Sequence, residues 1–243
     1  MKMFGLMFLA AFTALADTDL GTYGVTKITT DRQSIIVAVS YDDIGGTGGM
    51  SVSNLVKTTN LTAGDQLVVY LDRGTHESWL LATNELTGAL FWTPNEKTFT
   101  RDAAGNLIEG AGISASDTNL LFGTGLWLVR AAKPTEAYDF YVYGRPVNDP
   151  TYVTTAKAWH LVGNPTQQDR EITEDLIRGS NMDSIAVPGN GELLVNYIFR
   201  TGKGWRRTQD ASGQWGPAPV IPAGTGFWLK TAKPVTIKWR GEE

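Results

Sequence analysis

The stretch GTGLWL (residues 123–128) is repeated almost unchanged as GTGFWL (residues 224–229). In both copies apolar residues follow the second glycine without a break, and a short apolar run bounded by turn residues is typical of a buried strand. Successive side chains alternate between the two faces of a strand, so Trp127 and Trp228 are expected on the face opposite their leucine and phenylalanine neighbours. Such a strand belongs in the middle of a sheet. The glycines are expected to turn the chain sharply before it.

The similarity extends beyond these six residues and keeps the same order in both halves of the chain. The matched segments are 25–43 with 153–169, 52–56 with 173–177, 64–79 with 191–205, and 123–134 with 224–234. Collinear matches at this spacing predict a tandem duplication of one module, because the period is too long for a solenoid unit. We expect the first copy over residues 17–145 and the second over residues 150–243, with a linker near residues 144–151.

The offset between matched residues falls from the start of the copies to their end, which predicts an insertion in the first copy. We place it at about residues 100–119, a stretch rich in Gly, Ala, Asn and Ser. Residues of these types favour loops over regular structure. The insertion is therefore expected to be a loop that the second copy lacks.

The rest of each copy reads as strands. Runs of five to eight residues rich in Val, Ile, Tyr, Phe and Trp alternate with turn segments rich in Gly, Asn and Asp. The best helix candidates are the short segments 51–57 and 170–179, each opening with a residue able to cap a helix. The sequence therefore predicts an all-β protein made of two tandem copies of a small antiparallel β-sandwich or barrel, each with at most one short helix.

The first 16 residues are typical of a secretory signal peptide. Lys2 is followed by an apolar run and by the small-residue pattern Ala14-Leu15-Ala16. The run is too short to span a membrane, so we expect cleavage before Asp17 and no membrane span after it. The protein is then expected outside the bacterial cytoplasm, in the medium, at the cell surface or in the periplasm.

The composition narrows the classes of binding partner to be expected. The chain has 21 Lys and Arg against 25 Asp and Glu, a formal net charge of −4. Its longest basic block is the short run at residues 206–207, so nucleic acid is not an expected partner. The expected partners are other surface proteins or an extracellular polysaccharide.

Little in the chain predicts catalysis. It contains two histidines and no cysteine, which leaves few ligands for a transition metal. No serine lies in a Gly-x-Ser-x-Gly elbow. We therefore expect no catalytic residues, no metal site and no cofactor, although a secreted hydrolase stays open as a lesser alternative.

The aromatic residues allow two interpretations. Trp79, Trp92, Trp205 and Trp215 lie at or beside predicted hairpin turns. Exposed rings there would form a platform for sugars, and Lys203, Arg206 and Arg207 beside two of them would suit an acidic or sulfated polysaccharide. Alternatively, the pairs Trp79 with Trp205 and Trp92 with Trp215 are equivalent between copies and fill the core, with Trp205 and Trp215 clasping their hairpin across the strands.

The segments AWHLVGNPTQQD (residues 158–169) and IPAGTGFWLKTAKPVTIKW (residues 221–239) carry a family resemblance. They resemble a recurring module of secreted, largely uncharacterised proteins from Planctomycetes, Verrucomicrobia, Lentisphaerae and related bacteria, also found in Bacteroidetes surface proteins. The resemblance covers nearly the whole chain after residue 16, although VGNP has become VAVSYDD (residues 37–43) in the first copy. It implies export and β structure and brings no established catalytic or ligand residues.

Together these features predict an exported, non-enzymatic surface or structural protein that acts through protein–protein contacts. A module that binds extracellular glycans is the main alternative. The exposure of the four tryptophans distinguishes the two, because an exposed row of rings favours sugar binding and buried rings favour the structural role.

Overall fold

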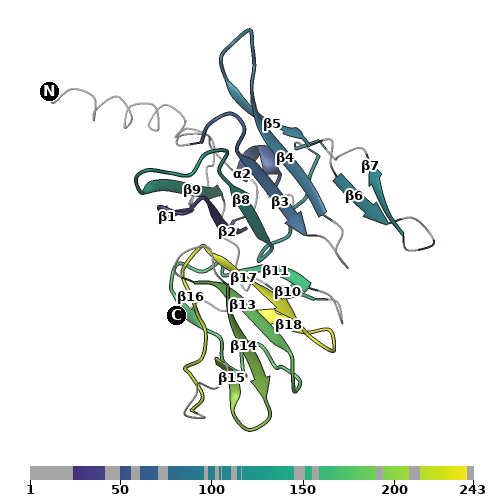
Figure 1. Cartoon of the computed structure of the whole chain (residues 1–243), viewed down its shortest axis with the longest axis vertical. Coiled ribbons are helices and arrows are strands. Elements are labelled where there is room, and N and C mark those ends of the chain that lie inside the picture. Colours follow the sequence, from purple (N-terminus) through teal and green to yellow (C-terminus); the bar gives the residue numbers. More distant parts are fainter. Residues whose placement is uncertain are drawn as a thin grey trace, which may run out of the picture.

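The computed structural model describes two β-rich halves (Figure 1). The described residues are 24–41, 50–55, 61–70, 76–95, 98–101, 104, 106–110, 114–115, 117–144, 151–154, 159–189, 194–207 and 214–239. Residues 1–16 and the centre of the expected linker lie outside this set. Among the described residues no helix has the length and apolar character needed to cross a membrane.

The described residues of the first half form nine strands and one short helix. They are β1 (Gly24–Thr30), β2 (Ser34–Ala38), α2 (Val52–Leu55), β3 (Gln66–Tyr70), β4 (His76–Thr83), β5 (Leu90–Pro94), β6 (Thr98–Arg101), β7 (Leu107–Gly110), β8 (Gly125–Val129) and β9 (Tyr138–Gly144). The helix lies inside the segment predicted to be helical. The predicted insertion is not a plain loop, because the hairpin of β6 and β7 enters it.

Nine strands are formed by the residues that the structure describes in the second half. They are β10 (Thr151–Val153), β11 (Trp159–Gly163), β12 (Arg170–Glu171), β13 (Ser184–Pro188), β14 (Leu194–Arg200), β15 (Gly204–Arg207), β16 (Val220–Ile221), β17 (Gly226–Lys230) and β18 (Thr236–Lys238). The helix considered at residues 170–179 is absent. Strand β12 occupies its start, and a single turn follows, in which the Ile177 amide donates to the Thr173 carbonyl.

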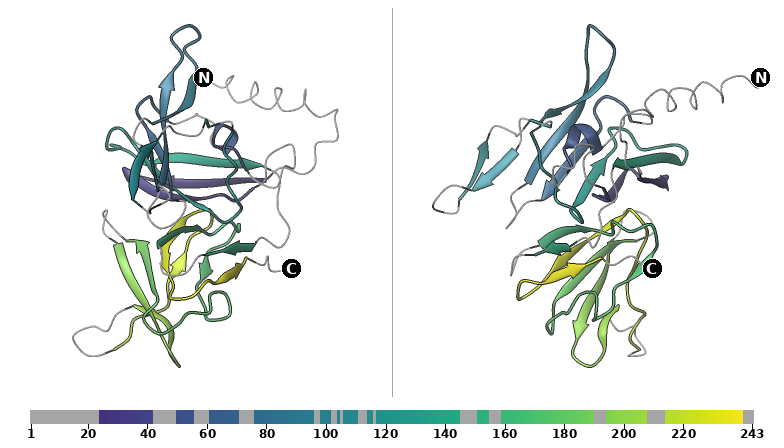
Figure 2. Two further views of the ribbon diagram at one scale, coloured as in Figure 1. Left: turned by 90° about the vertical axis from the view of Figure 1, so that its right-hand side faces the viewer. Right: turned by 180° about the vertical axis from the view of Figure 1, so that it is seen from behind.

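Each half is a sandwich of one large sheet and one two-stranded ribbon, and the strand pairs among the described residues are antiparallel (Figure 2). In the first half the ribbon β1–β9 covers the sheet β2-β8-β3-β4, which β6 and β7 extend and to which β5 adds through β4. In the second half the ribbon β10–β18 covers the sheet β11-β17-β13-β14-β15, and β12 pairs with β16. The predicted all-β class is confirmed.

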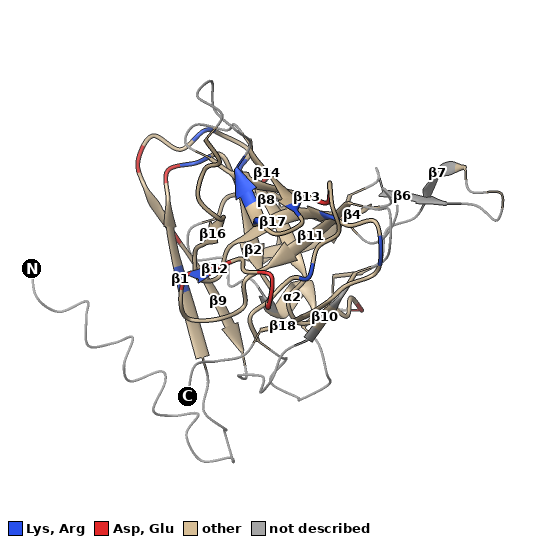
Figure 3. Ribbon diagram, turned by 90° about the horizontal axis from the view of Figure 1, so that it is seen from below, with Lys and Arg blue, Asp and Glu red and all other residues tan. Residues whose placement is uncertain are grey.

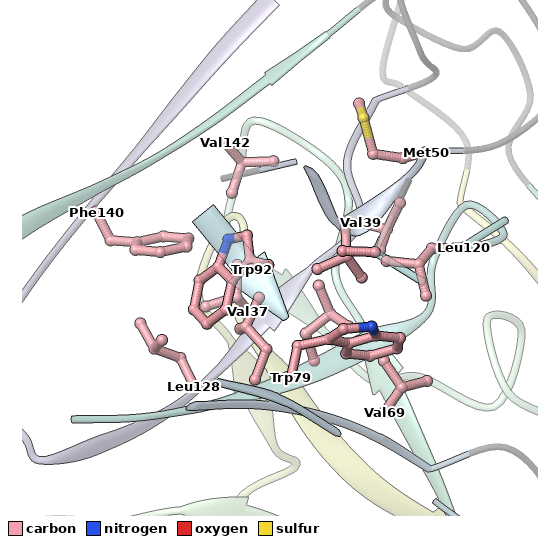
Figure 4. Packing of buried hydrophobic residues seen from close by; sticks show 14 of the residues in the cluster. Val37, Val39, Met50, Val69, Trp79, Trp92, Leu120, Leu128, Phe140 and Val142 are labelled. Carbon is pink, nitrogen blue, oxygen red and sulfur yellow. The ribbon is translucent and has the colours of Figure 1, made fainter. Parts of the chain in front are cut away.

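Each sandwich has its own apolar core. In the first half Phe140 and Val142 from the ribbon face Leu128 and Val37 from the sheet, with Trp92 between them (Figure 4). In the second half Ile237 and Trp239 on the ribbon side pack with Phe227, Leu229 and Phe199 of the sheet. The GTG strands β8 and β17 are therefore central strands that contribute to these cores, as their sequence predicts.

Strand order is the same in the two halves. The order β2-β8-β3-β4-β5 corresponds to β11-β17-β13-β14-β15, and the ribbon β1–β9 to β10–β18. The pairings make Gly125 equivalent to Gly226, since Gly125 pairs with Ala38 and Gly226 with Gly163. The shared order agrees with two copies of one topology. Their origin by duplication stays a prediction.

The register corrects one of the sequence matches. Segment 64–79 was matched with 191–205, but the structure makes Gln66 equivalent to Ser184, because each pairs with the same position of its GTG strand. The sequence match was shifted by one strand. As a result Trp92 corresponds to Trp205, both lying opposite the equivalent residues Leu81 and Phe199, while Trp79 corresponds to Tyr197.

A buried aspartate supports this register. Asp65, just before β3, accepts hydrogen bonds from the amides of Thr62 and Ala131 at 2.9 Å each. Asp183, just before β13, accepts from the amides of Ser180 and Ala232 at 2.6 and 2.7 Å. Both aspartates are buried, and each ties the loop before its strand to the chain beyond the GTG strand.

The backbone just before these aspartates also has the same geometry in the two halves. Gly64 has a φ of 95° and Met182 a φ of 75°, and Met182 is the one non-glycine residue with positive φ among those described. A methionine in this region is strained relative to glycine. Met182 nevertheless adopts this positive φ because it is equivalent to Gly64, and the fold requires a left-handed turn at this position.

The two GTG motifs join the halves. The Ala38 amide donates to the Gly224 carbonyl at 2.7 Å, and the equivalent Gly163 amide donates to the Gly123 carbonyl at 2.8 Å. The contact is thus reciprocal, like the self-complementary interface of a twofold dimer. Short antiparallel bridges flank it, between Val37 and Thr225 and between Thr124 and Val162.

The two glycines of each motif have different roles. Gly123 and Gly224 have φ values of 77° and 69°, so they make the predicted turn. Gly125 and Gly226 do not have positive φ and instead allow close approach. A Cβ on Gly125 would lie 2.9 Å from the Leu161 backbone carbon, and one on Gly226 would lie 2.6 Å from the Ile36 Cγ2.

A third apolar layer lies between the halves. Its buried side chains lie outside both cores and come from the outer faces of the two large sheets: Ile36, Ala38, Val68, Leu161 and Ala186. At its border the Trp127 and Trp228 rings meet edge to face at 6.4 Å between centroids, and Tyr70 packs on Trp228 at 4.6 Å. The two halves therefore form one packed body.

We expect Gly226→Val to destabilise the protein, because the new side chain meets the Val162 carbonyl oxygen at 2.5 Å from its Cβ and presses on Ile36. Overpacking of this kind costs roughly 1–3 kcal/mol. Urea unfolding measures the loss. The control is Lys230→Val, which places the same residue at the exposed end of the same strand and should change stability by less than about 0.5 kcal/mol. Equal stability of the two variants would contradict the close approach.

Candidate functional site

The structure buries three of the four tryptophans considered as sugar platforms. Trp79 and Trp92 are 1% and 6% exposed in the first core, and Trp205 is 1% exposed in the second. Trp215 alone is partly exposed. Because strand side chains alternate, these three rings point into the sandwich even though they lie near hairpin turns. They present no ring face to a ligand.

Trp205 is held inside its hairpin by two contacts. Its indole N–H donates to the Ile177 carbonyl at 2.8 Å. Its ring meets Phe199, directly across the strand pair, edge to face at 5.4 Å. The expected clasp with Trp215 is therefore corrected: the cross-strand partner of Trp205 is Phe199, and Trp215 lies on a different segment.

Trp215 lies on the segment that runs along the edge of β15 facing away from β14. The Arg207 amide donates to the Pro217 carbonyl at 3.2 Å, which aligns the segment around Trp215 with that strand. The Arg200 guanidinium carbon lies 5.8 Å from the centre of the Trp215 ring, within the range of a cation–π contact. The ring is thus placed next to the outer face of the hairpin.

Four cations lie on this hairpin, and Arg200 is the one in contact with the Trp215 ring. Arg200 and Arg206 lie on the outer face of the β14–β15 hairpin, Lys203 in its turn and Arg207 at its end. None of them forms an ion pair with another described residue, since the ion pairs within that set are Lys27–Asp139 and Arg130–Asp65. Basic residues colour the end of β14 in Figure 3. We call Arg200, Lys203, Arg206, Arg207 and Trp215 the basic hairpin.

The turn that carries these cations is tightly defined. Gly202 and Gly204 have φ values of 73° and 71°, and the Lys203 amide donates to the Arg200 carbonyl at 2.9 Å. The Arg206 guanidinium donates to the Trp205 carbonyl at 2.9 Å. These bonds fix the backbone that carries the cations.

A second polar cluster lies on the outer face of the ribbon β1–β9. Lys27 and Asp139 form an ion pair at 3.0 Å beside Tyr141 and Tyr143, whose rings stack at 6.1 Å. The hydrogen bond to Asp139 raises the pKa of Lys27, and the same bond lowers the pKa of Asp139. Because these charges neutralise each other, the cluster offers less to a charged ligand than the basic hairpin does.

The histidines occupy structural positions. His160 is buried, and the His76 ring lies 5.6 Å from the Tyr70 ring near the junction of the halves. Within the described parts of the chain, no three His, Cys, Asp or Glu side chains gather in a way that could hold a metal ion.

The sequence predicted Lys203, Arg206 and Arg207 beside Trp205 and Trp215. The structure places the three cations on the β14–β15 hairpin and Trp215 on a separate segment. The sequence prediction did not include Arg200, because the alternation of residues in LVNYIFR indicates only a strand. It also missed the apolar outer face of the β4–β5 hairpin. The alternation of SWLLAT against ALFWTP could have indicated that face, since buried Leu81 and Trp92 imply that Leu80 and Phe91 point outward.

No family model, curated protein or solved structure matches this chain. The resemblance to secreted bacterial modules therefore stays a prediction from the sequence.

We expect Trp205→Ala to destabilise the protein by roughly 3–5 kcal/mol, because it empties a buried site and leaves the Ile177 carbonyl without its donor. Trp215→Ala should cost less than about 1 kcal/mol, since the ring is only partly buried. Thermal and urea unfolding of both variants measure the difference. Equal losses would instead support the clasp between the two rings.

Proposed function

We propose that this chain is a non-catalytic protein, exported from a bacterium, that acts by binding another protein at the cell surface. The observation that supports this proposal is the apolar outer face of the β4–β5 hairpin. Leu80 and Phe91 are 38% and 46% exposed, and Leu86 at the turn is 96% exposed. Apolar residues gathered on one exposed element are typical of protein contact sites.

Three apolar residues of the β4–β5 hairpin share its outer face. Ala82 pairs directly with Phe91, and Leu80 lies two residues before Ala82 on the same strand, so all three side chains point outward. The opposite face carries Leu81 and Trp92, which are buried in the core. The hairpin therefore uses one face for folding and leaves the other for a partner.

The turn holds Leu86 outward in a defined position. The Asn84 side-chain oxygen accepts from the amides of Leu86 and Thr87 at 2.9 and 3.1 Å, and the Asn84 amide donates to the Ala89 carbonyl at 2.8 Å. Both views of Figure 2 show this hairpin reaching away from the second half. An apolar side chain presented on an ordered turn loses little conformational entropy on binding.

The apolar hairpin also continues an interface within the chain. The same face of the sheet is covered at β2, β3 and β8 by the second half, through Ile36, Val68 and Trp127. This cover by the second half ends at β4 and β5, but the outer face of these two strands is still apolar. A partner that docks there would extend a contact that already excludes water.

The basic hairpin favours a second candidate partner. The expected alternative, an extracellular polysaccharide, does not suit the β4–β5 hairpin, whose outer face offers few polar groups. It suits the cations of the β14–β15 hairpin better. The export that both candidates require rests on residues 1–16.

A photo-reactive phenylalanine analogue in place of Leu86 tests the protein contact in cells that produce the chain. We expect one discrete protein crosslink, lost when Phe91→Asp is added, because the charge disrupts the apolar face. The control position is Thr201, exposed in the turn of the equivalent hairpin, which should give no such product. Crosslinks of equal yield at both positions, or none at residue 86, would refute the proposed contact.

A further inference from the structure

We propose that the basic hairpin binds an acidic polysaccharide. It consists of the four cations Arg200, Lys203, Arg206 and Arg207 and the partly exposed Trp215. This site lies on a different hairpin from the proposed protein contact, and it depends on the export prediction but not on that contact.

The fold does not require these charges. The residues equivalent to Arg200, Arg206 and Arg207 in the first half are Ala82, Thr93 and Pro94, none of which is charged. The two hairpins nevertheless pair in the same register on equivalent sheets. A charge that the matching hairpin lacks is available for a role other than folding.

Within the part of the chain that the structure describes, these four charges have no ion-pair partner. No described acidic residue pairs with any of the four, although the chain as a whole carries a net charge of −4. Clustering like charges costs free energy unless a counter-charge binds. Carboxylate and sulfate groups are the anions that guanidinium donors bind with two parallel hydrogen bonds.

Trp215 distinguishes a sugar from other polyanions. Its ring is an apolar surface beside the Arg200 guanidinium. Such a ring can pack on the C–H face of a pyranose while guanidinium groups bind the acidic substituents. An acidic peptide would be bound by the charges alone. Nucleic acid is a less suitable ligand, because the cationic surface is confined to one hairpin rather than forming the extended patch that a duplex needs.

The test measures binding of the chain, purified after export, to immobilised polygalacturonate and dextran sulfate, with uncharged dextran as the negative surface. The main variant is R200Q/K203Q/R206Q. The matched control is R178Q/K233Q/K238Q, which removes three exposed cations elsewhere in the second half and has the same net charge. A third variant is W215A. Circular dichroism and thermal melts check that each variant is folded.

We expect the wild type to bind at least one acidic polysaccharide and not dextran. The main variant should bind at least about tenfold more weakly, as expected for the loss of three charged donors, and the control should change by less than about twofold. W215A should weaken binding by about threefold or more through loss of ring packing.

Polyglutamate and duplex DNA are the competing ligands. Binding of polyglutamate or DNA as tight as that of the polysaccharide, with W215A unchanged, would replace the assignment by a purely electrostatic one. Absence of binding to both acidic polysaccharides, or equal losses in the main variant and the control, would overturn it. None of these results affects the crosslink expected at residue 86, so each proposal can be refuted without the other.

Discussion

The close backbone approach at the two GTG motifs is the constraint on which the rest of the structure depends. Where Ala38 meets Gly163 and each amide bonds to a glycine carbonyl of the other half, there is no room for larger side chains. This contact brings the outer faces of both sheets together and buries Ile36 and Leu161. Each half thereby covers part of a sheet face that would otherwise be exposed to water.

The same geometry determines which surfaces stay free. In both halves the strands nearest the GTG strand are covered, and the equivalent hairpins β4–β5 and β14–β15 extend beyond the junction. The two hairpins share their pairing and their buried residue, Trp92 or Trp205, but not their outer faces. One carries Leu80 and Phe91, and the other carries Arg200 and Arg206. Equivalent scaffolds thus present two chemically different surfaces.

The sequence predicted the all-β class, the turn at the first glycine and the central position of both GTG strands, because these depend on local patterns. It misassigned the hairpins by one strand, since successive strand–turn–strand segments ending in Trp look alike. The aspartates just before the strands, Asp65 and Asp183, were a better indicator of which strands are equivalent, because a buried aspartate at the same spacing from a strand has a specific role. That Gly125 and Gly226 contact the other half could not be predicted, because close approach between distant segments leaves no local pattern.

Amide hydrogen exchange of Ala38 and Gly163 tests the reciprocal junction most directly. Both amides should be protected to a similar degree and exchange as slowly as those of the central strands, because they open only when the halves separate or the protein unfolds. Fast exchange of both, at rates typical of exposed turns, would contradict the junction. Protection of one without the other would contradict its reciprocity.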